Sequence, residues 1–349
     1  MTSGRPDLTV RGGGIFGLAI AYEAARRGAR IRLIERIRIG AGSSGGHVGA
    51  LAPHVPEQWN PKKQFQFESL QMAEGFWAGV AGTGGGDPGY ARFGRIQPLA
   101  DEAQIARARD RAEGAAALWQ GFAQWRIAPV AEFGPFAPPS PTGLVIHDTL
   151  SARANPRAAD AALVAALEAM GAEIVIGEAE EIGPVIHATG APGLADLAAA
   201  LGKPVGNGVK GQSALLKFDA GDVPQIYAES LHIIPHSDGT VAIGSTSERD
   251  FDAPDTTDAR LEALIDKARS LCPPLAAAPV IDRWAGLRPR AKSRAPMLGP
   301  WPGREGHFIA NGGFKIGFGM APKVAQVMVD LVLEQRDAIP DGFRVTDNL

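Results

Sequence analysis

Three glycines near the N-terminus have the spacing of a phosphate-binding turn. Gly12, Gly14 and Gly17 form G-x-G-x-x-G between an apolar strand at 8–10 and an Ala-rich helix at 15–27. The first glycine permits a tight turn, the second lets the backbone approach a pyrophosphate, and the third lets helix and strand pack closely. Backbone N–H groups at the helix start then face the anion, so the chemistry predicted here is dinucleotide binding.

A carboxylate follows at the distance that such a site requires. The apolar strand at 31–34 delivers Glu35, about twenty residues beyond the glycines, where it accepts hydrogen bonds from a ribose 2′-OH. An acid there argues against a 2′-phosphate. A plain strand–turn–helix is the alternative. Arg11, at the end of the first strand, has no explanation in the sequence.

Two further segments suit the same site. The glycine-rich loop after Glu35 carries Ser43 and Ser44, whose hydroxyls can donate to phosphate, although a flexible surface loop is the alternative. Later, the short apolar strand before Thr189 and Gly190 ends in small residues. This ending suits a strand that returns to the cofactor sheet, where larger side chains would block a ligand; an ordinary strand and turn is equally compatible.

The last third of the chain carries cations at even spacing, namely Arg288, Arg290, Lys292 and Arg294. In an extended segment they share one side. Arg288 stands between Leu287 and Pro289, which favours an ordered position, and its planar guanidinium is suited to grip a carboxylate by two bonds. A solvated face remains the alternative for the other three.

A second cation lies in a glycine-punctuated turn. Lys315 follows a short apolar strand and precedes a helix, and we place Pro322 in the first turn of that helix. The start of this helix directs positive backbone potential at whatever occupies the far end of the cofactor.

Composition narrows the class of protein. The chain of 349 residues has a formal net charge of -3, which predicts no general attraction to nucleic acid or to an anionic membrane. Cys272 is the single cysteine, so we expect no intramolecular disulfide and no metal site. No signal peptide or membrane-spanning run is apparent, and we expect a cytoplasmic protein.

The order of elements predicts a mixed α/β fold with two lobes. A βαβ half comes first, and a long helix is expected from Asp101 to Trp125. Later, the strands QSALLKF, QIYAESLHIIP and TVAIGST alternate like an antiparallel sheet before the chain returns to the first lobe.

Motifs along nearly the whole chain resemble the D-amino-acid oxidase superfamily, with most similarity to its glycine oxidase and sarcosine oxidase branches. They are GGGIFGLAIAYEAARRGA with LIER, GALAP, NPRAADAALVAALEAMGAEI, HATGAPG, IIPHSDGTVAIGSTSE, WAGLRP and NGGFKIGFGMAP. The resemblance implies noncovalent FAD and a glutathione-reductase-type fold: a Rossmann-like domain with a central parallel sheet, plus a substrate domain with an antiparallel sheet. It implies a FAD-binding domain of residues 1–55, 151–205 and 283–349, and a substrate domain of residues 56–150 and 206–282.

The resemblance also assigns residues. Arg288 stands where glycine oxidases hold the substrate carboxylate, and Lys315 where sarcosine oxidases place a lysine for the same task. His232 replaces a tyrosine of glycine oxidases, Ala242 a lysine that assists oxygen reduction, and Gly286 a cysteine that is linked to flavin. The implied FAD contacts are Gly12, Gly14, Ile15, Phe16, Gly17, Glu35, Arg36, Ser43, Ser44, Gly49, Ala50, Leu51, Ala188, Thr189, Gly190, Gly313, Lys315, Ile316, Gly317 and Phe318.

These assignments predict a flavoenzyme that oxidises a carbon–nitrogen bond of a small amino acid or N-alkyl amino acid. Arg288 and Lys315 would fix the carboxylate. His232 or His54 is a candidate for tuning the protonation of the amine, with a structural role as the alternative. O2 or another acceptor would reoxidise the flavin, and the oligomeric state stays open, a homo-oligomer included. The rival interpretations are a tRNA-modifying flavoprotein and a noncatalytic FAD subunit of an amine dehydrogenase.

Overall fold

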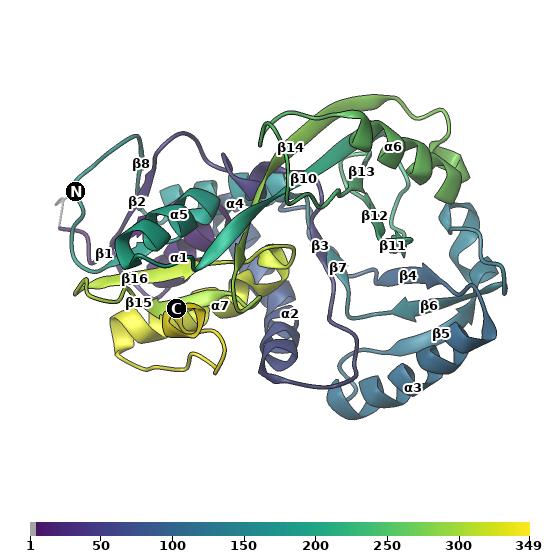
Figure 1. Cartoon of the computed structure of the whole chain (residues 1–349), viewed down its shortest axis with the longest axis horizontal. Coiled ribbons are helices and arrows are strands. Elements are labelled where there is room, and N and C mark those ends of the chain that lie inside the picture. The colour runs from purple at the N-terminus through teal and green to yellow at the C-terminus, as the bar shows by residue number, and fades with distance from the viewer. Residues whose placement is uncertain (1–4) are drawn as a thin grey trace.

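The computed structural model describes residues 5–349, and within them two large sheets lie side by side (Figure 1). The smaller sheet is parallel apart from one edge pair, because α-helical crossovers return the chain in the same direction. Its strands are, in spatial order, β15 (Met297–Pro300), β16 (His307–Asn311), β9 (Val185–His187), β1 (Leu8–Arg11), β2 (Ile31–Glu35) and β8 (Glu173–Ile176).

The larger sheet is antiparallel except where β11 runs parallel to β4. Its strands are, in spatial order, β14 (Val280–Ala291), β10 (Gly206–Lys217), β13 (Thr240–Gly244), β12 (Leu231–Pro235), β11 (Gln225–Ala228), β4 (Arg95–Pro98), β6 (Leu144–Asp148) and β5 (Trp125–Pro129). A short ribbon of β3 (Ala50–Leu51) and β7 (Ala152–Arg153) stands between the two sheets.

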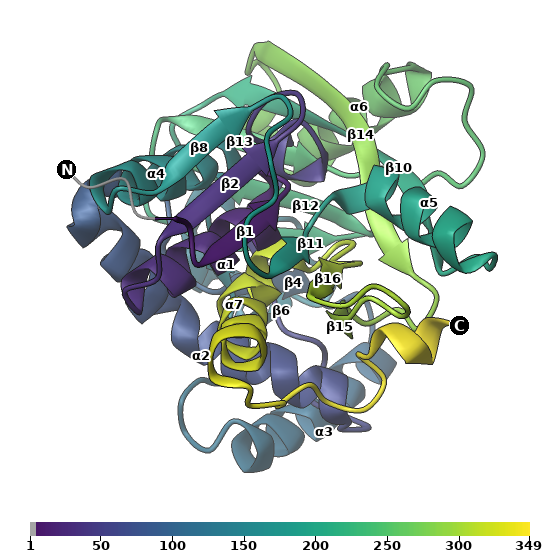
Figure 2. The ribbon, with the colours of Figure 1, turned by 90° about the vertical axis from the view of Figure 1, so that its left-hand side faces the viewer.

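Helices cover the parallel sheet and lie against parts of both faces of the antiparallel sheet. Helix α1 packs on α4 and α7, α7 packs on α2, and α5 lies beside β10 and β14 (Figure 2). The helices are α1 (Ile15–Arg26), α2 (Pro61–Val80), α3 (Glu102–Leu118), α4 (Pro156–Ala169), α5 (Gly190–Leu201), α6 (Ala259–Leu271) and α7 (Gly317–Glu334), with short helical turns η1 (Ser43–Gly45), η2 (Ala81–Gly85), η3 (Val130–Phe136), η4 (Pro273–Leu275) and η5 (Val345–Asn348).

Local capping explains where several helices begin. The side chains of Asn60, Asp101 and Asp258 accept hydrogen bonds from backbone N–H groups in the first turns of α2, α3 and α6. Such caps satisfy donors that a helix leaves unpaired at its start. The predicted mixed α/β fold with one mainly parallel and one antiparallel sheet is confirmed.

Some element boundaries differ from those predicted. The helix expected to reach Trp125 ends at Leu118, and Trp125 begins β5. The stretch read as one strand, QIYAESLHIIP, is a hairpin that turns at Glu229 and Ser230, both with positive φ. Helix α7 begins at Gly317, so Pro322 lies inside it rather than in its first turn.

Long strands also tie the two lobes together. Strand β14 pairs with β10 along most of its length. Residues 283–291, which we assigned to the FAD-binding domain, are therefore hydrogen-bonded to a strand of the predicted substrate domain. This arrangement brings Arg288 into the antiparallel sheet while the segment after it returns to the parallel sheet.

The two faces of the antiparallel sheet differ in chemistry. One face carries Ile226, Ile233 and Ile243, which pack with Leu261 and Ile265 of α6 in a buried apolar cluster. Because successive residues of a strand point to opposite faces, the alternate residues face the other way. We call that opposite side the inner face.

Candidate active site

The glycine turn after β1 is closed by backbone that leaves no room for side chains. Gly12 has φ +110°, and a Cβ there would lie 2.3 Å from the carbonyl oxygen of Ala188 at the end of β9. A Cβ on Gly17 would lie 1.9 Å from the carbonyl oxygen of Gly12. The first and third glycines of the motif therefore hold the turn, α1 and β9 in close contact, as their spacing predicts.

Glu35 and Ser44 fix the two sides of this turn. One carboxylate oxygen of Glu35 accepts from the Gly13 N–H at 2.7 Å and the other from the Ile37 N–H at 2.9 Å. The Ser44 Oγ accepts from the Ile15 N–H at 2.9 Å, which leaves the hydroxyl hydrogen available to donate. Backbone donors therefore position both side chains, Glu35 at Gly13 and Ile37 and Ser44 at the first residue of α1.

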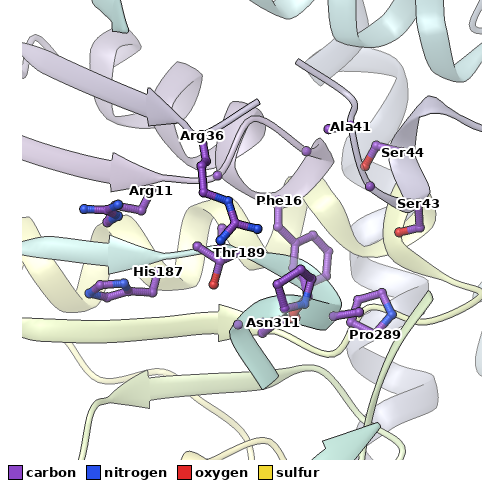
Figure 3. A pocket seen from close by; sticks show the side chains of 18 of the residues that line it. Arg11, Phe16, Arg36, Ala41, Ser43, Ser44, His187, Thr189, Pro289 and Asn311 are labelled. Carbon is purple, nitrogen blue, oxygen red and sulfur yellow. Dashed lines mark hydrogen bonds between the residues drawn. The ribbon is translucent and has the colours of Figure 1, made fainter. Parts of the chain in front are cut away.

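A cavity of about 620 Å³ runs along this turn and the ends of the neighbouring strands. Figure 3 shows Arg36 reaching from the end of β2 toward Thr189, with Arg11 and His187 at one end and Ser43 and Pro289 at the other. The predicted cofactor residues that line it are Gly12, Gly14, Ile15, Phe16, Glu35, Arg36, Ser43, Ser44, Ala188, Thr189, Gly190, Gly313 and Gly317.

The other predicted cofactor residues lie outside the lining. They are Gly17, Gly49, Ala50, Leu51, Lys315, Ile316 and Phe318. Gly49 abuts backbone instead, since a Cβ there would lie 2.0 Å from the carbonyl oxygen of Ala154, and Ala50 and Leu51 form β3. Their contact with the cofactor stays a prediction.

Several lining residues escaped the sequence interpretation. Asn311 lies at the end of β16 and donates to the Gly190 carbonyl at 2.8 Å, and Pro289 and Phe314 line the end near Arg288. At the opposite end, the His187 Nε2 lies 3.0 Å from the His307 Nδ1, and burial lowers the pKa of His187 to about 4. The position of a residue at the carboxyl end of a cofactor-sheet strand is the signal that would have found His187 and Asn311.

Arg11 now has a structural explanation. Its guanidinium forms ion pairs with Glu178 at 2.8 Å and Glu181 at 2.9 Å, both in the connection between β8 and β9. Arg11 therefore holds the connection between β8 and β9 at one end of the cavity.

Arg288 is buried, with 8% of its surface exposed, on the inner face of β14. Its terminal nitrogens donate to the Ser245 hydroxyl at 2.6 Å and to the carbonyls of Lys210 at 3.2 Å and Thr246 at 2.6 Å. Burial lowers its pKa to about 10, so it stays charged at neutral pH. A guanidinium has five N–H donors, so Nε–H and one Nη1–H remain for a ligand.

Lys315 and Arg288 both lie near the aromatic ring of Phe314. Its Nζ is 5.8 Å from the ring centroid of Phe314, and the Cζ of Arg288 is 5.5 Å from that centroid. Desolvation and the positive charge of Arg288 lower the pKa of Lys315. The structure therefore brings the two predicted carboxylate ligands around a residue that lines the cavity.

His232 lies on the inner face of β12, its ring tilted over Tyr227 at a centroid distance of 4.6 Å. Its Nδ1 is buried and has no hydrogen-bond partner among residues 5–349. Burial, with the charges of Arg95 and Lys315, lowers its pKa to about 3. A base that weak does not hold an amine proton at neutral pH, so the geometry favours a hydrogen-bonding role.

The remaining candidates have simpler surroundings. His54 is bonded through Nδ1 to the side-chain oxygen of Gln66, which favours the structural alternative. In the cationic row, Arg290 is half-buried over Phe314, whereas Lys292 and Arg294 are exposed beyond the end of β14. The solvated-face interpretation thus suits the last two.

The chemistry of the cavity fits FAD. Helices α1, α5 and α7 all begin at its wall, and the N–H groups of a helix start favour phosphate and other negative charge. Gly313 lets the opposite wall approach, since a Cβ there would lie 2.8 Å from the Phe16 ring. Gly286 lines the cavity without a thiol, which agrees with noncovalent attachment.

Comparison with known proteins gives one consistent result. The model of the DAO family, described as FAD dependent oxidoreductase, matches residues 7–331. Glycine oxidase of Geobacillus kaustophilus is 26% identical over 96% of this chain and 94% of its own. Glycine oxidase of Pseudomonas putida is 39% identical over 126 residues, a match that spans 34% of that relative and 36% of this chain.

Solved structures agree on the fold. The glycine oxidase of Geobacillus kaustophilus has a TM-score of 0.83 at 22% identity over 99% of this chain and 100% of its own. An iminodiacetate oxidase from Chelativorans sp. BNC1 has a TM-score of 0.84 at 20% identity over 97% of this chain and 98% of its own. With its glycine turn, its acid at the end of β2 and a family match along nearly its whole length, this chain belongs to the DAO family of FAD-dependent oxidoreductases.

Proposed function

We propose that this protein oxidises a carbon–nitrogen bond of a small amino acid or N-alkyl amino acid. The observation that carries the proposal is the pair of cations around Phe314, at the end of the FAD cavity. Glycine oxidases among the relatives act, by their name, on an amino acid, and this supports the same substrate class here.

FAD, when bound, accepts the two electrons that leave the substrate carbon as a hydride. The protein positions the substrate. Arg288 and Lys315 hold its carboxylate, which converts an encounter in solution into a fixed geometry. The amine gives up its proton to solvent, and water then hydrolyses the imine product to a carbonyl compound and an amine.

The surroundings of the two cations support binding rather than proton transfer. Arg288 is held by two backbone carbonyls and Ser245, so its orientation is set before substrate arrives. His232, with its pKa near 3, contributes an unprotonated ring nitrogen on the inner face. Helix α7, whose first residue Gly317 lines the cavity, adds positive backbone potential that stabilises developing negative charge.

The electron acceptor and the location of the protein are parts of the same proposal. Ala242 is buried between Leu215 and Ile234 and supplies no cation for oxygen chemistry, so we leave O2 and another acceptor as outcomes of the test. Within residues 5–349, no helix combines the length and apolar character that a membrane crossing requires. We propose a cytoplasmic enzyme, to be checked by fractionation of cells.

The test is anaerobic reduction of the purified yellow protein by small amino acids, followed by absorbance at the flavin band. We expect bleaching by at least one amino acid or N-alkyl amino acid. Readmission of air, or of a dye in its place, then identifies the acceptor. A colourless protein that takes up no FAD, or a flavin that no amino acid bleaches, would refute the proposal.

A further inference from the structure

The inner face of the antiparallel sheet carries a third buried cation, Arg95, on β4. With 7% of its surface exposed, it donates from Nε to Asp148 at 2.9 Å. Neither of its two terminal nitrogens has a protein partner among residues 5–349, and neither is fully enclosed. Arg95 therefore keeps unused donors that face accessible space, although most of its side chain is buried.

The strand registers place Arg95 on the same face as the proposed substrate residues. Directly paired residues in neighbouring strands point to the same side of a sheet. Arg95 pairs with Gln225, and Tyr227, two residues further along β11, pairs with His232. The register then runs from His232 through Gly244 and Ser213 to Trp284, four residues before Arg288 on β14. Since residues on one strand that differ by an even number of positions point to the same side, all of these side chains share the inner face.

Short contacts link Arg95 to that group. Its guanidinium carbon lies 5.6 Å from the ring centroid of Tyr227, whose ring contacts His232. The positive charges of both Arg95 and Lys315 lower the pKa of His232, so both cations lie close enough to act on that ring. Arg95 is therefore a third cation near the group that contains Arg288, Lys315 and His232.

Polar atoms without partners lie along this path. The Nδ1 of His232 and the Nε2 of Gln97, which lies on β4 two residues after Arg95, are both buried and unpartnered among residues 5–349. Burying a polar group without a hydrogen bond is costly, so groups of this kind indicate a place that a polar ligand satisfies. Arg95 forms an ion pair with Asp148. This pair compensates the buried positive charge of Arg95 when no substrate is bound.

We propose that Arg95 binds a second acidic group of the substrate, so that this enzyme prefers an amino acid with two carboxylates. The inference rests on the proposed function and narrows it. The first carboxylate lies at Arg288 and Lys315, the substrate extends along His232, and its far carboxylate meets the free donors of Arg95. A dicarboxylic amino acid and an N-carboxyalkyl amino acid share this chemistry.

The test compares the holoenzyme with Arg95→Gln in anaerobic flavin reduction. The substrates are both enantiomers of aspartate and glutamate, and iminodiacetate, set against glycine, sarcosine and alanine. We expect the wild type to favour a dicarboxylic substrate by about 10-fold or more, and Arg95→Gln to raise the KM of that substrate by about 10- to 100-fold, as the loss of a hydrogen bond to a charged group predicts. The kcat for a monocarboxylic substrate should change less than about twofold, and Arg95→Lys should recover part of the loss.

Arg92→Gln is the matched control. It removes an equal charge from the same segment, but Arg92 is exposed and lies over Phe122, so no substrate should change in KM. If Arg95→Gln does not fold, titration of the wild-type flavin spectrum with succinate and glutarate, against acetate and propionate, decides the question. We expect the dicarboxylates to bind about 10-fold more tightly.

The outcomes separate the two proposals. A flavin bleached only by monocarboxylic amino acids, equal binding of mono- and dicarboxylates, or an equal rise in KM for both substrate types in Arg95→Gln would overturn the role of Arg95 and leave the proposed function standing. The last result would assign Arg95 a structural role with Asp148. A flavin that no amine reduces would refute the proposed function itself.

Discussion

The cofactor turn and the inner face of the antiparallel sheet are built on opposite principles. At the turn, Gly12 and Gly17 act by lacking side chains, and the neighbours they touch are backbone atoms. On the inner face, Arg288 and Arg95 are long side chains that are held by partners far away in the sequence. A site made of backbone is determined by the residues of one short segment. A site made of side chains depends on which strands become neighbours in the fold. Substitutions should therefore have different consequences in the two regions.

The largest effect is expected at the turn. Gly12→Ala forces a Cβ against the Ala188 carbonyl at a φ of +110°, with about 3 kcal/mol of combined strain. We expect FAD binding to weaken about 100-fold, measured by flavin content and by FAD titration of the apoprotein. Gly75→Ala is the control, since Gly75 lies in α2 with open space around it. Full flavin content in Gly12→Ala would contradict the close packing described here.

Arg288→Ala should separate substrate binding from cofactor binding. Two charge-assisted bonds to the substrate carboxylate are lost, so the KM of an amino acid should rise about 100-fold. FAD should remain bound, because Arg288 does not line the cavity. Arg290→Ala, which removes a half-buried cation over the same ring, should change the KM less than about threefold. Unchanged substrate affinity in Arg288→Ala would exclude the assigned role.

Lys315 offers a test through pH. Its pKa is lowered by desolvation and by Arg288, so it loses its charge at a lower pH than an ordinary lysine. Acetate has no amine and its carboxylate is charged throughout this range, so its affinity should fall as pH rises through the lowered pKa. Flavin absorbance reports the binding.

Lys315→Met should bind acetate about fivefold more weakly at neutral pH, and its remaining alkaline decline should follow Arg288 alone, whose pKa is about 10. Lys315→Arg should lose less affinity than the wild type as pH rises, because a guanidinium ordinarily keeps its charge to a higher pH than an amine. A decline that persists unchanged in Lys315→Met would assign the titration to another group.

Arg11→Ala should have the smallest effect and should act on stability alone. Arg11 is about one quarter exposed, Glu178 is largely exposed, and surface ion pairs contribute about 1 kcal/mol or less. We expect the melting temperature to fall by about 1–3 °C with unchanged KM. Arg30→Ala, which removes an exposed pair with Asp7, should lower it less. A large loss of FAD in Arg11→Ala would show that Arg11 contacts the cofactor directly.

Sequence patterns were sufficient to predict those features that depend only on residues close together in the chain. The turn at Gly12 and the carboxylate of Glu35 lie where the sequence predicts them, because glycine spacing and strand periodicity act within a few residues. The hairpin at Glu229 and Ser230 was missed for the same reason, since its turn has positive φ without glycine.

Only the tertiary structure decided which distant residues meet. It joined Arg11 to Glu178 and Glu181, and it brought Arg288 to the same ring as Lys315. It also placed Arg95 on the face that carries His232, although 137 positions separate them in the chain. Strand register fixes such contacts, and register is set by the packing of whole sheets rather than by any segment of the sequence. The sequence by itself determined a dinucleotide turn and the candidate cations, and the fold determined which of those cations share one site.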